Sequence, residues 1–167
     1  GSSVSGTQAY LNVDGTNTGW KGIATVDMLP PGDEPMSLAS TVATTNFSNR
    51  LNVQNGKAVS LDFGSNWELF DMSDVANPVS RYVSSTAMSI GKINDDRLYM
   101  IESSSDVLHV FDISDLSLPI VLGTIDLAGG ASSDKSIDVI GSTVYVATEF
   151  GTYIVDAATP SAMTIVN

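Results

Sequence analysis

Four aspartates recur along the chain at almost even intervals, and carboxylates are common groups in acid–base catalysis and cation binding. They are Asp27, Asp71, Asp112 and Asp156, separated by 44, 41 and 44 residues. Each one ends a short apolar run and is followed by a proline and a second apolar run. An aspartate in this place can accept the backbone N–H groups of the turn that follows it. Because the residue recurs once per repeat, we expect structural turn caps and not catalytic acids.

Nucleophilic catalysis has few residues to work with in this sequence. The chain has no cysteine, which excludes disulfides and thiolate metal sites, and His109 is its only histidine. His109 occupies the repeat position that Ala24, Glu68 and Tyr153 hold in the other units. A position that accepts such different side chains is typical of a solvated or half-exposed strand site. We therefore expect no catalytic or ligand role for His109.

Carboxylates are numerous enough for a glycosidase-type pair, but no pair stands out. Glu102 and Glu149 both follow the second strand of their units, which favours a repeat feature over an active site. The sequence therefore leans toward a protein that is not an enzyme. A carboxylate-based hydrolase or lyase stays a third hypothesis, and it requires Asp and Glu side chains that converge in one cleft.

Calcium is the one ion for which the sequence offers a candidate site. Asn12, Asp14 and Asn17 place oxygen ligands around Gly15, in a pattern that faintly resembles a calcium loop. The bidentate glutamate at the twelfth position is missing, and no other cofactor is expected. Two tryptophans are candidates for binding, and they are Trp20 and Trp67. Both can belong to the core, and Trp20 can equally be an exposed residue that stacks on a sugar or peptide partner.

The strands that must position these residues follow the same period. In the most regular unit, runs of β-branched and aromatic residues cover 87–93, 97–101, 107–111 and 118–125, with Gly, Asn, Asp and Ser between them. A period of 41–44 residues with four short strands predicts an all-β chain, a β-propeller of about four four-stranded blades. We expect one domain over 1–167, with repeat units at about 2–45, 46–85, 86–130 and 131–167.

The turn after each third strand resembles the LVIVD repeat. Its clearest copy is Leu108 to Asp115, and further copies are Leu69 to Asp74 and Tyr153 to Asp156. The resemblance covers residues 50–166 well and is thin over 1–49. It implies a β-propeller of bacterial or archaeal origin, exported or attached to the cell surface, in a family mostly without assigned activity. It implies no reaction.

Propellers of this repeat type usually have more than four blades. The chain is therefore expected to be a small four-bladed ring, a part of a larger propeller, or a half-ring that pairs with a second copy. Open blades would leave unpaired strand edges and an uncovered apolar face, and both features drive association.

Charge narrows the choice of partners. Seven basic residues against nineteen acidic residues give a net charge of −12, which disfavours nucleic acid and anionic lipid. No apolar run approaches the roughly 20 residues that a membrane-spanning helix needs, so we expect no membrane insertion. The sequence predicts a non-enzymatic binding module whose rim contacts a protein or a glycan. The alternative is a self-assembling unit, a homo-oligomer joined through open blade edges.

Overall fold

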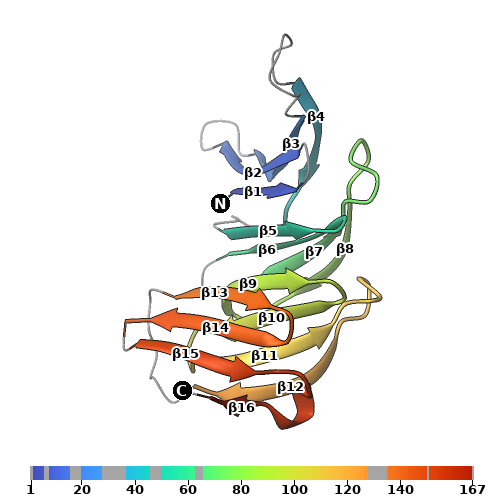
Figure 1. Cartoon of the computed structure of the whole chain (residues 1–167). Helices are drawn as coiled ribbons and strands as arrows, with labels where there is room; N and C mark the ends of the chain where they lie inside the picture. The colour runs from blue at the N-terminus through green and yellow to red at the C-terminus, as the bar shows by residue number, and fades with distance from the viewer. Residues whose placement is uncertain are drawn as a thin grey trace, which may run out of the picture.

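A computed structural model shows four four-stranded antiparallel sheets, which confirms the all-β prediction. The structure describes residues 2–5, 8–15, 20–27, 37–45, 50–62, 66–127, 135–149 and 151–166. Each sheet is built from strands that are consecutive in sequence, in the manner of a propeller blade. We number the sheets as blades 1 to 4 in chain order. Figure 1 shows the blue blade 1 above the green blade 2, and the orange-red blade 4 overlapping blade 3 in the lower half of the view.

The first two blades have regular strand order. Blade 1 comprises β1 (Ser2–Ser5), β2 (Gln8–Gly15), β3 (Trp20–Asp27) and β4 (Ser37–Ala43). Blade 2 comprises β5 (Arg50–Gln54), β6 (Lys57–Leu61), β7 (Trp67–Asp71) and β8 (Val79–Ser84).

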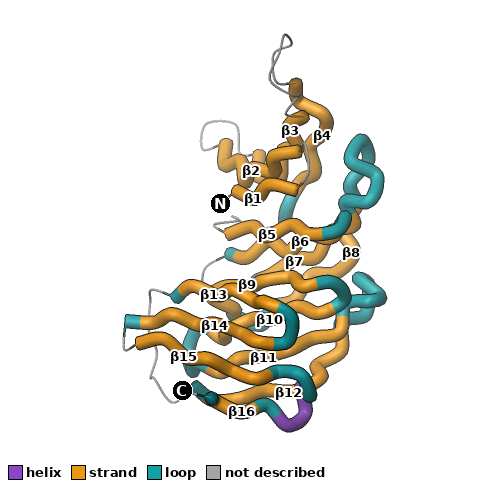
Figure 2. The backbone as a smooth tube through the Cα atoms, viewed as in Figure 1, coloured by secondary structure: helices purple, strands orange, loops and turns teal. Residues whose placement is uncertain are grey.

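The last two blades repeat this order with one addition. Blade 3 comprises β9 (Met88–Asn94), β10 (Arg97–Glu102), β11 (Val107–Asp112) and β12 (Ile120–Asp126). Blade 4 comprises β13 (Ser136–Ile140), β14 (Thr143–Thr148), β15 (Gly151–Asp156), the 3-10 helix η1 (Pro160–Ala162) and β16 (Thr164–Ile165). The sequence predicts a last strand over 163–166, and the observed strand is shorter. Figure 2 shows η1 as a purple turn beside β12.

Tight hairpins join the first two strands of blades 2 to 4. Asn55 and Gly56 both have positive φ, at 50° and 73°, and Asp95 and Gly141 have φ of 55° and 60°. Gly, Asn and Asp tolerate this left-handed region, which two-residue hairpins require. The local turn chemistry of the sequence thus sets the register of these three hairpins.

The four blades form an open arc. β1 and β2 contact β5, β5 and β6 contact β9, and β9 contacts β13, so each blade packs on the next. Within the described ranges, no extensive contact links blade 1 to blade 4. In Figure 1, blade 1 lies at the top of the view, away from blade 4, which overlaps blade 3 in the lower half. The chain is therefore part of a propeller and not a closed ring in this structure.

Each junction between blades has its own apolar core. Blades 2 and 3 meet around Trp67, whose ring lies 5.1 Å from that of Tyr82 and 5.5 Å from that of Phe111, centroid to centroid. Blades 3 and 4 meet through a second cluster, and blades 1 and 2 through a third. No helix within the described residues is long and apolar enough to cross a membrane.

Candidate functional site

The recurring aspartates lie on one rim of the arc, at the turns after the third strands. A carboxylate oxygen of Asp71 accepts the backbone N–H of Ser73 at 3.1 Å. Asp112 and Asp156 accept the N–H groups two residues ahead at 2.8 Å and 2.9 Å. This geometry satisfies turn donors that would otherwise lack partners. Asp27 ends β3 and accepts Gln8 Nε2 at 3.3 Å, and the turn after it lies outside the described residues.

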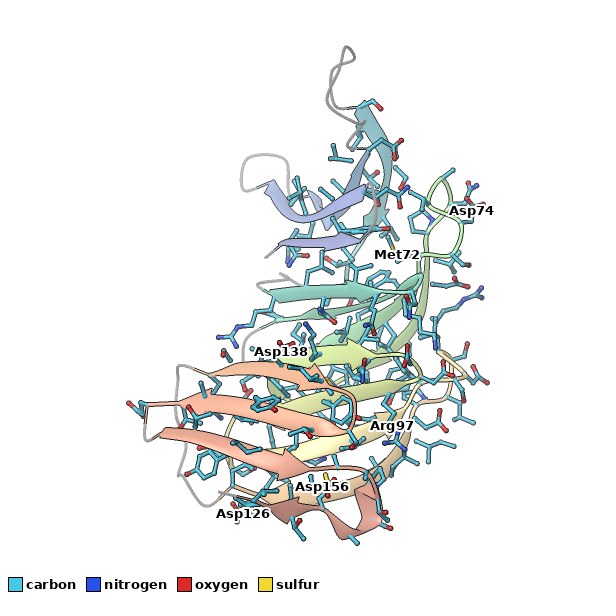
Figure 3. The ribbon with its side chains drawn as sticks, in the orientation of Figure 1. Met72, Asp74, Arg97, Asp126, Asp138 and Asp156 are labelled. Atoms are coloured by element: carbon cyan, nitrogen blue, oxygen red, sulfur yellow. The ribbon has the colours of Figure 1, made fainter. Side chains whose placement is uncertain are left out.

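Hydrogen bonds on this rim lower the pKa of three of its carboxyl groups, those of Asp71, Asp74 and Asp112. Hydrogen bonds from Ser73 and from Arg81 lower the pKa of Asp71 to about 2. The Ser114 N–H and hydroxyl likewise lower the pKa of Asp112. Asp74 lies on the projecting loop between β7 and β8 in Figure 3, and hydrogen bonds from Asn77 and the backbone lower its pKa. Such carboxylates are poor proton donors near neutral pH, because a general acid needs a pKa near the working pH.

A polar cleft of about 410 Å³ opens on this rim between blades 2 and 3. Its walls are the β5–β6 hairpin, the turns after β7 and β11, and the side chain of Arg81. Arg81 is already paired with Asp71, with 2.9 Å between Nη2 and Oδ2. The cleft therefore offers hydroxyls and paired charges, which suit a hydrated polar partner more than an apolar one.

Cationic connectors link the rims of successive blades. Lys57 begins β6 and donates to the carbonyl of Ile113 in blade 3 at 3.4 Å. Arg97 begins β10 and donates to the carbonyl of Ala157 in blade 4 at 3.3 Å. Figure 3 labels Arg97 beside the turn that follows β15. Thr143 holds the same place in β14, so blade 4 carries no cation for a following blade.

One row of side chains on each blade points toward the following blade, and we call it the trailing row. Its members stand in register on the second, third and fourth strands. They are Tyr10, Thr25 and Ser40 in blade 1, Val59, Leu69 and Tyr82 in blade 2, Tyr99, Val110 and Gly123 in blade 3, and Tyr145, Ile154 and Val166 in blade 4.

The trailing row of blade 4 is uncovered. In blades 1 to 3 the row members on the second and third strands are all buried. In blade 4, Tyr145 is 36% exposed and Ile154 is half-buried, while Val166, just after β16, and Ile140 at the end of β13 are 65% and 66% exposed. The row keeps its apolar character, although the structure places no further blade on it.

The opposite side of each blade, which we call the leading face, packs on the trailing row of the preceding blade. In blade 4 it carries Val144, Val146 and Val155, all buried against blade 3. Ala9, Leu11 and Val26 hold the corresponding register positions in blade 1. Leu11 and the nearby Val13 are 39% and 37% exposed. The arc therefore ends in two uncovered apolar faces, one on blade 1 and one on blade 4.

Of the two tryptophan candidates, the structure describes the side chain of Trp67 alone. Trp67 is 2% exposed within the core between blades 2 and 3, so it is not available as a binding surface. Trp20 begins β3, and its side chain lies outside the described residues, as does that of Asp14 in β2.

Only part of the candidate calcium loop lies within the described residues. The amide of Asn12 is buried without a hydrogen-bond partner, and Asn17 lies outside the described residues. Among the residues that the structure describes, no group of three or more His, Asp or Glu side chains is placed to hold a metal ion.

The strand position shared by Ala24, Glu68, His109 and Tyr153 is less exposed than the sequence predicts. Ala24 and Glu68 are buried, and His109 and Tyr153 are half-buried. The expectation of a solvated or half-exposed position is met by His109 and Tyr153, and it is wrong for Ala24 and Glu68, which are buried on the leading faces of their blades. Burial lowers the pKa of His109, and Glu102, whose Oε2 lies 3.8 Å from Nε2, opposes this shift.

Glu68 is a buried carboxylate that ties two blades together. It accepts the Thr45 N–H at 3.0 Å and the Thr45 hydroxyl at 3.2 Å from the chain that follows blade 1. Within its own blade it accepts the Ser80 hydroxyl at 2.6 Å. A buried charge needs partners of this kind to offset its loss of hydration.

Sequence reasoning missed a second buried charge. Lys135, just before β13, forms an ion pair with Asp106, just before β11, and both side chains are almost fully buried. Lys135 also donates to the carbonyl of Glu102 at 3.2 Å. The sequence signal was weak, because the two residues are far apart and neither belongs to the repeated turn.

No family model matches the chain, and no curated protein matches it. Three solved structures illustrate what its fold is similar to. A protein of Lactobacillus plantarum is 13% identical, with a TM-score of 0.77 over 99% of this chain and 54% of its own. Hsv2 of Kluyveromyces lactis is 12% identical, with a TM-score of 0.68 over 99% of this chain and 60% of its own. The computationally designed Ika4 protein is 12% identical, with a TM-score of 0.61 over 99% and 89%.

These similarities show a fold and not a family. The solved propellers confirm the β-propeller architecture of the four blades. The chain spans about half the length of the first solved structures it matches, at 54%, 52% and 55%. The chain thus has the fold of a partial β-propeller.

Proposed function

We propose that this chain is a non-enzymatic assembly module, which associates with protein through the uncovered blade faces at the two ends of its arc. The observation that carries this proposal is the trailing row of blade 4. Tyr145 is 36% exposed there, while its counterparts Val59 and Tyr99 in blades 2 and 3 are buried. Val166 is 65% exposed, while its counterparts Tyr82 and Gly123 are half-buried. Contiguous apolar patches on a soluble protein mark interaction sites.

The polar groups of the rim support binding more than catalysis. Asp71, Asp112 and Asp156 already accept hydrogen bonds from their own turns. The lowered pKa of Asp71 and Asp112 suits a structural acceptor and not a proton donor. A hydrolase would instead need a second carboxyl group held protonated nearby.

The rim cleft favours a second candidate function, the binding of a polar partner such as a glycan. Its hydroxyl-bearing walls, between the turns of blades 2 and 3, provide donors and acceptors, with Leu116 as an apolar member of the lining. A glycan-array comparison of the wild type with Ser73→Trp, which fills the cleft, tests this candidate. Equal binding by both proteins would exclude the cleft.

The setting of the protein belongs to the same proposal. The likeness of Leu108 to Asp115 to the LVIVD repeat supports an exported or surface-attached prokaryotic protein. An assembled arc on a cell surface would act as a scaffold, and the charge of −12 supports solubility there.

The assembly function is tested by the absolute mass in solution, measured by light scattering over a wide range of concentration. We expect a mass above the 17.5 kDa of one chain. Tyr145→Asp places a charge in the centre of the open face and should return the mass to that of one chain. Thr86→Asp adds the same charge to an exposed loop and should leave the association unchanged. A wild-type chain that stays monomeric throughout would overturn the proposal.

A further inference from the structure

We propose that the trailing row of blade 4 receives the leading face of blade 1 from a second copy of this chain. Two chains then close head to tail into one ring of eight blades. This inference rests on the assembly function proposed above, and it names the partner and the geometry.

The register of the blades carries the first step. At the junction of blades 3 and 4, Tyr99 and Val110 of one trailing row pack with Val144 and Val155 of the next leading face. Blade 4 repeats this row, with Tyr145 and Ile154 paired in the same register as Tyr99 and Val110. Blade 4 therefore has the surface on which another blade packs.

Blade 1 carries the matching surface. Leu11 pairs with Ala24 across β2 and β3, as Val146 pairs with Tyr153 across β14 and β15. Leu11 thus holds the place that Val146 holds in blade 4, where that side chain is fully buried against blade 3. The leading face of blade 1 is built to pack on a preceding blade, and the arc provides none.

A second copy is the occupant that satisfies both faces at once. Blade 4 of each copy meets blade 1 of the other, so both uncovered faces are buried in a closed ring. A contact between two trailing rows would leave both leading faces exposed, and no junction within the chain is of that kind. The first three solved structures that the chain matches support this size, because the chain covers 54%, 52% and 55% of their lengths. A ring thus needs about as much chain again, which one more copy provides.

The new junction differs in charge from the junctions within the chain. Thr143 begins β14, as Lys57 begins β6 and Arg97 begins β10. Lys57 and Arg97 each donate to a carbonyl of the following blade, and Thr143 has no cationic group to do the same. Ile140 holds in blade 4 the strand position that Asn94 holds in blade 3. The side chain of Asn94 donates to the Gly141 carbonyl of blade 4, and the apolar Ile140 cannot make such a hydrogen bond to a following blade. Two copies of charge −12 also repel each other. Added salt should therefore strengthen the pairing, by screening the repulsion and favouring apolar burial.

Cysteine cross-linking tests the arrangement, since the chain has no cysteine of its own. Tyr145→Cys and Leu11→Cys chains are mixed and treated with a short bismaleimide. We expect a cross-linked species of two chains from the mixture and none from either variant alone. A second pair, Ala147→Cys with Val13→Cys, leaves the native side chains of Tyr145 and Leu11 in place. This pair should give the same cross-linked product. Val83→Cys, on an exposed strand of blade 2, mixed with Leu11→Cys is the matched control and should give none.

The other outcomes separate this inference from the assembly function. A cross-link between two Tyr145→Cys chains would show that like faces meet, which overturns the head-to-tail ring and leaves assembly in place. A wild-type mass that keeps growing beyond two chains with concentration would mean that the contact does not close. A monomer would overturn both proposals.

Discussion

Gly123 of β12 lies directly beneath the carbonyl of Pro160, which belongs to η1 of the next blade. A Cβ placed on Gly123 would come within 1.8 Å of that oxygen, which no side chain can occupy without movement of the backbone. Gly123 is the outer member of the trailing row of blade 3. The close approach therefore fixes blade 4 on blade 3, and the missing side chain is what allows it.

Gly123→Ala should separate η1 from β12 and destabilise the protein. Overpacking of this kind costs about 1–3 kcal/mol, because the neighbouring backbone must shift. Urea unfolding followed by circular dichroism measures the loss as a lower midpoint. Thr124→Ala, at the exposed neighbouring position, is the control and should leave the midpoint nearly unchanged. An unchanged midpoint for Gly123→Ala would show that the contact is not made in solution.

Glu68 should be the residue on which the junction of blades 1 and 2 most depends. Glu68→Ala removes the acceptor of the Thr45 N–H, the Thr45 hydroxyl and the Ser80 hydroxyl. Buried donors left without a partner cost about 1–3 kcal/mol, so we expect a loss of that size in the free energy of unfolding. Glu149→Ala removes an exposed glutamate and should cost little.

Hydrogen exchange gives the second measurement on Glu68. Glu68→Gln retains one carbonyl acceptor and should fall between the wild type and Glu68→Ala. The loss of protection should concentrate in β3 and β4, which pack against blade 2. Uniform loss over all four blades would contradict a local role for Glu68.

The sequence predicts the sheets well because their determinants are local. The turn pairs Asn55–Gly56 and Asp95–Asp96 identify the hairpins, and the recurring Asp71 and Asp112 give the period. η1 was missed because Pro160 starts a turn whose form depends on its contact with Gly123. Local patterns cannot describe such contacts between blades.

The candidate site was predictable only in part. An alignment of the units in register places Tyr10, Tyr99 and Tyr145 in one column, which is a usable signal for the trailing row. The burial of Glu68 depends on Thr45, 23 residues away along the chain, and no local pattern indicates that pairing.

The buried pair of Asp106 and Lys135 should behave as a unit. Lys135→Met removes the partner of a buried carboxylate, and breaking such a pair costs about 3–5 kcal/mol. The double variant Asp106→Asn/Lys135→Met removes both charges and should recover much of that loss. Asparagine is chosen because Asp106 has a φ of +56°, which asparagine tolerates. Additive losses in a double-mutant cycle, measured by urea unfolding, would show that the two residues are not coupled.

His109 should give the protein a pH dependence near neutrality. Burial lowers its pKa in the folded state below the unfolded value of about 6.5, with Glu102 opposing the shift. The unfolded chain therefore binds the proton more readily, so stability is complete above pH of about 6.5 and is lost as the pH falls through the folded pKa. Urea unfolding at closely spaced pH values should show this decline in the free energy of unfolding. His109→Gln should flatten the decline, even if the variant is more or less stable than the wild type at every pH. Asp71, whose pKa is lowered to about 2, contributes stability that is lost at much lower pH, between roughly pH 4 and 2. A decline near pH 6 that persists in His109→Gln would assign the dependence to another group.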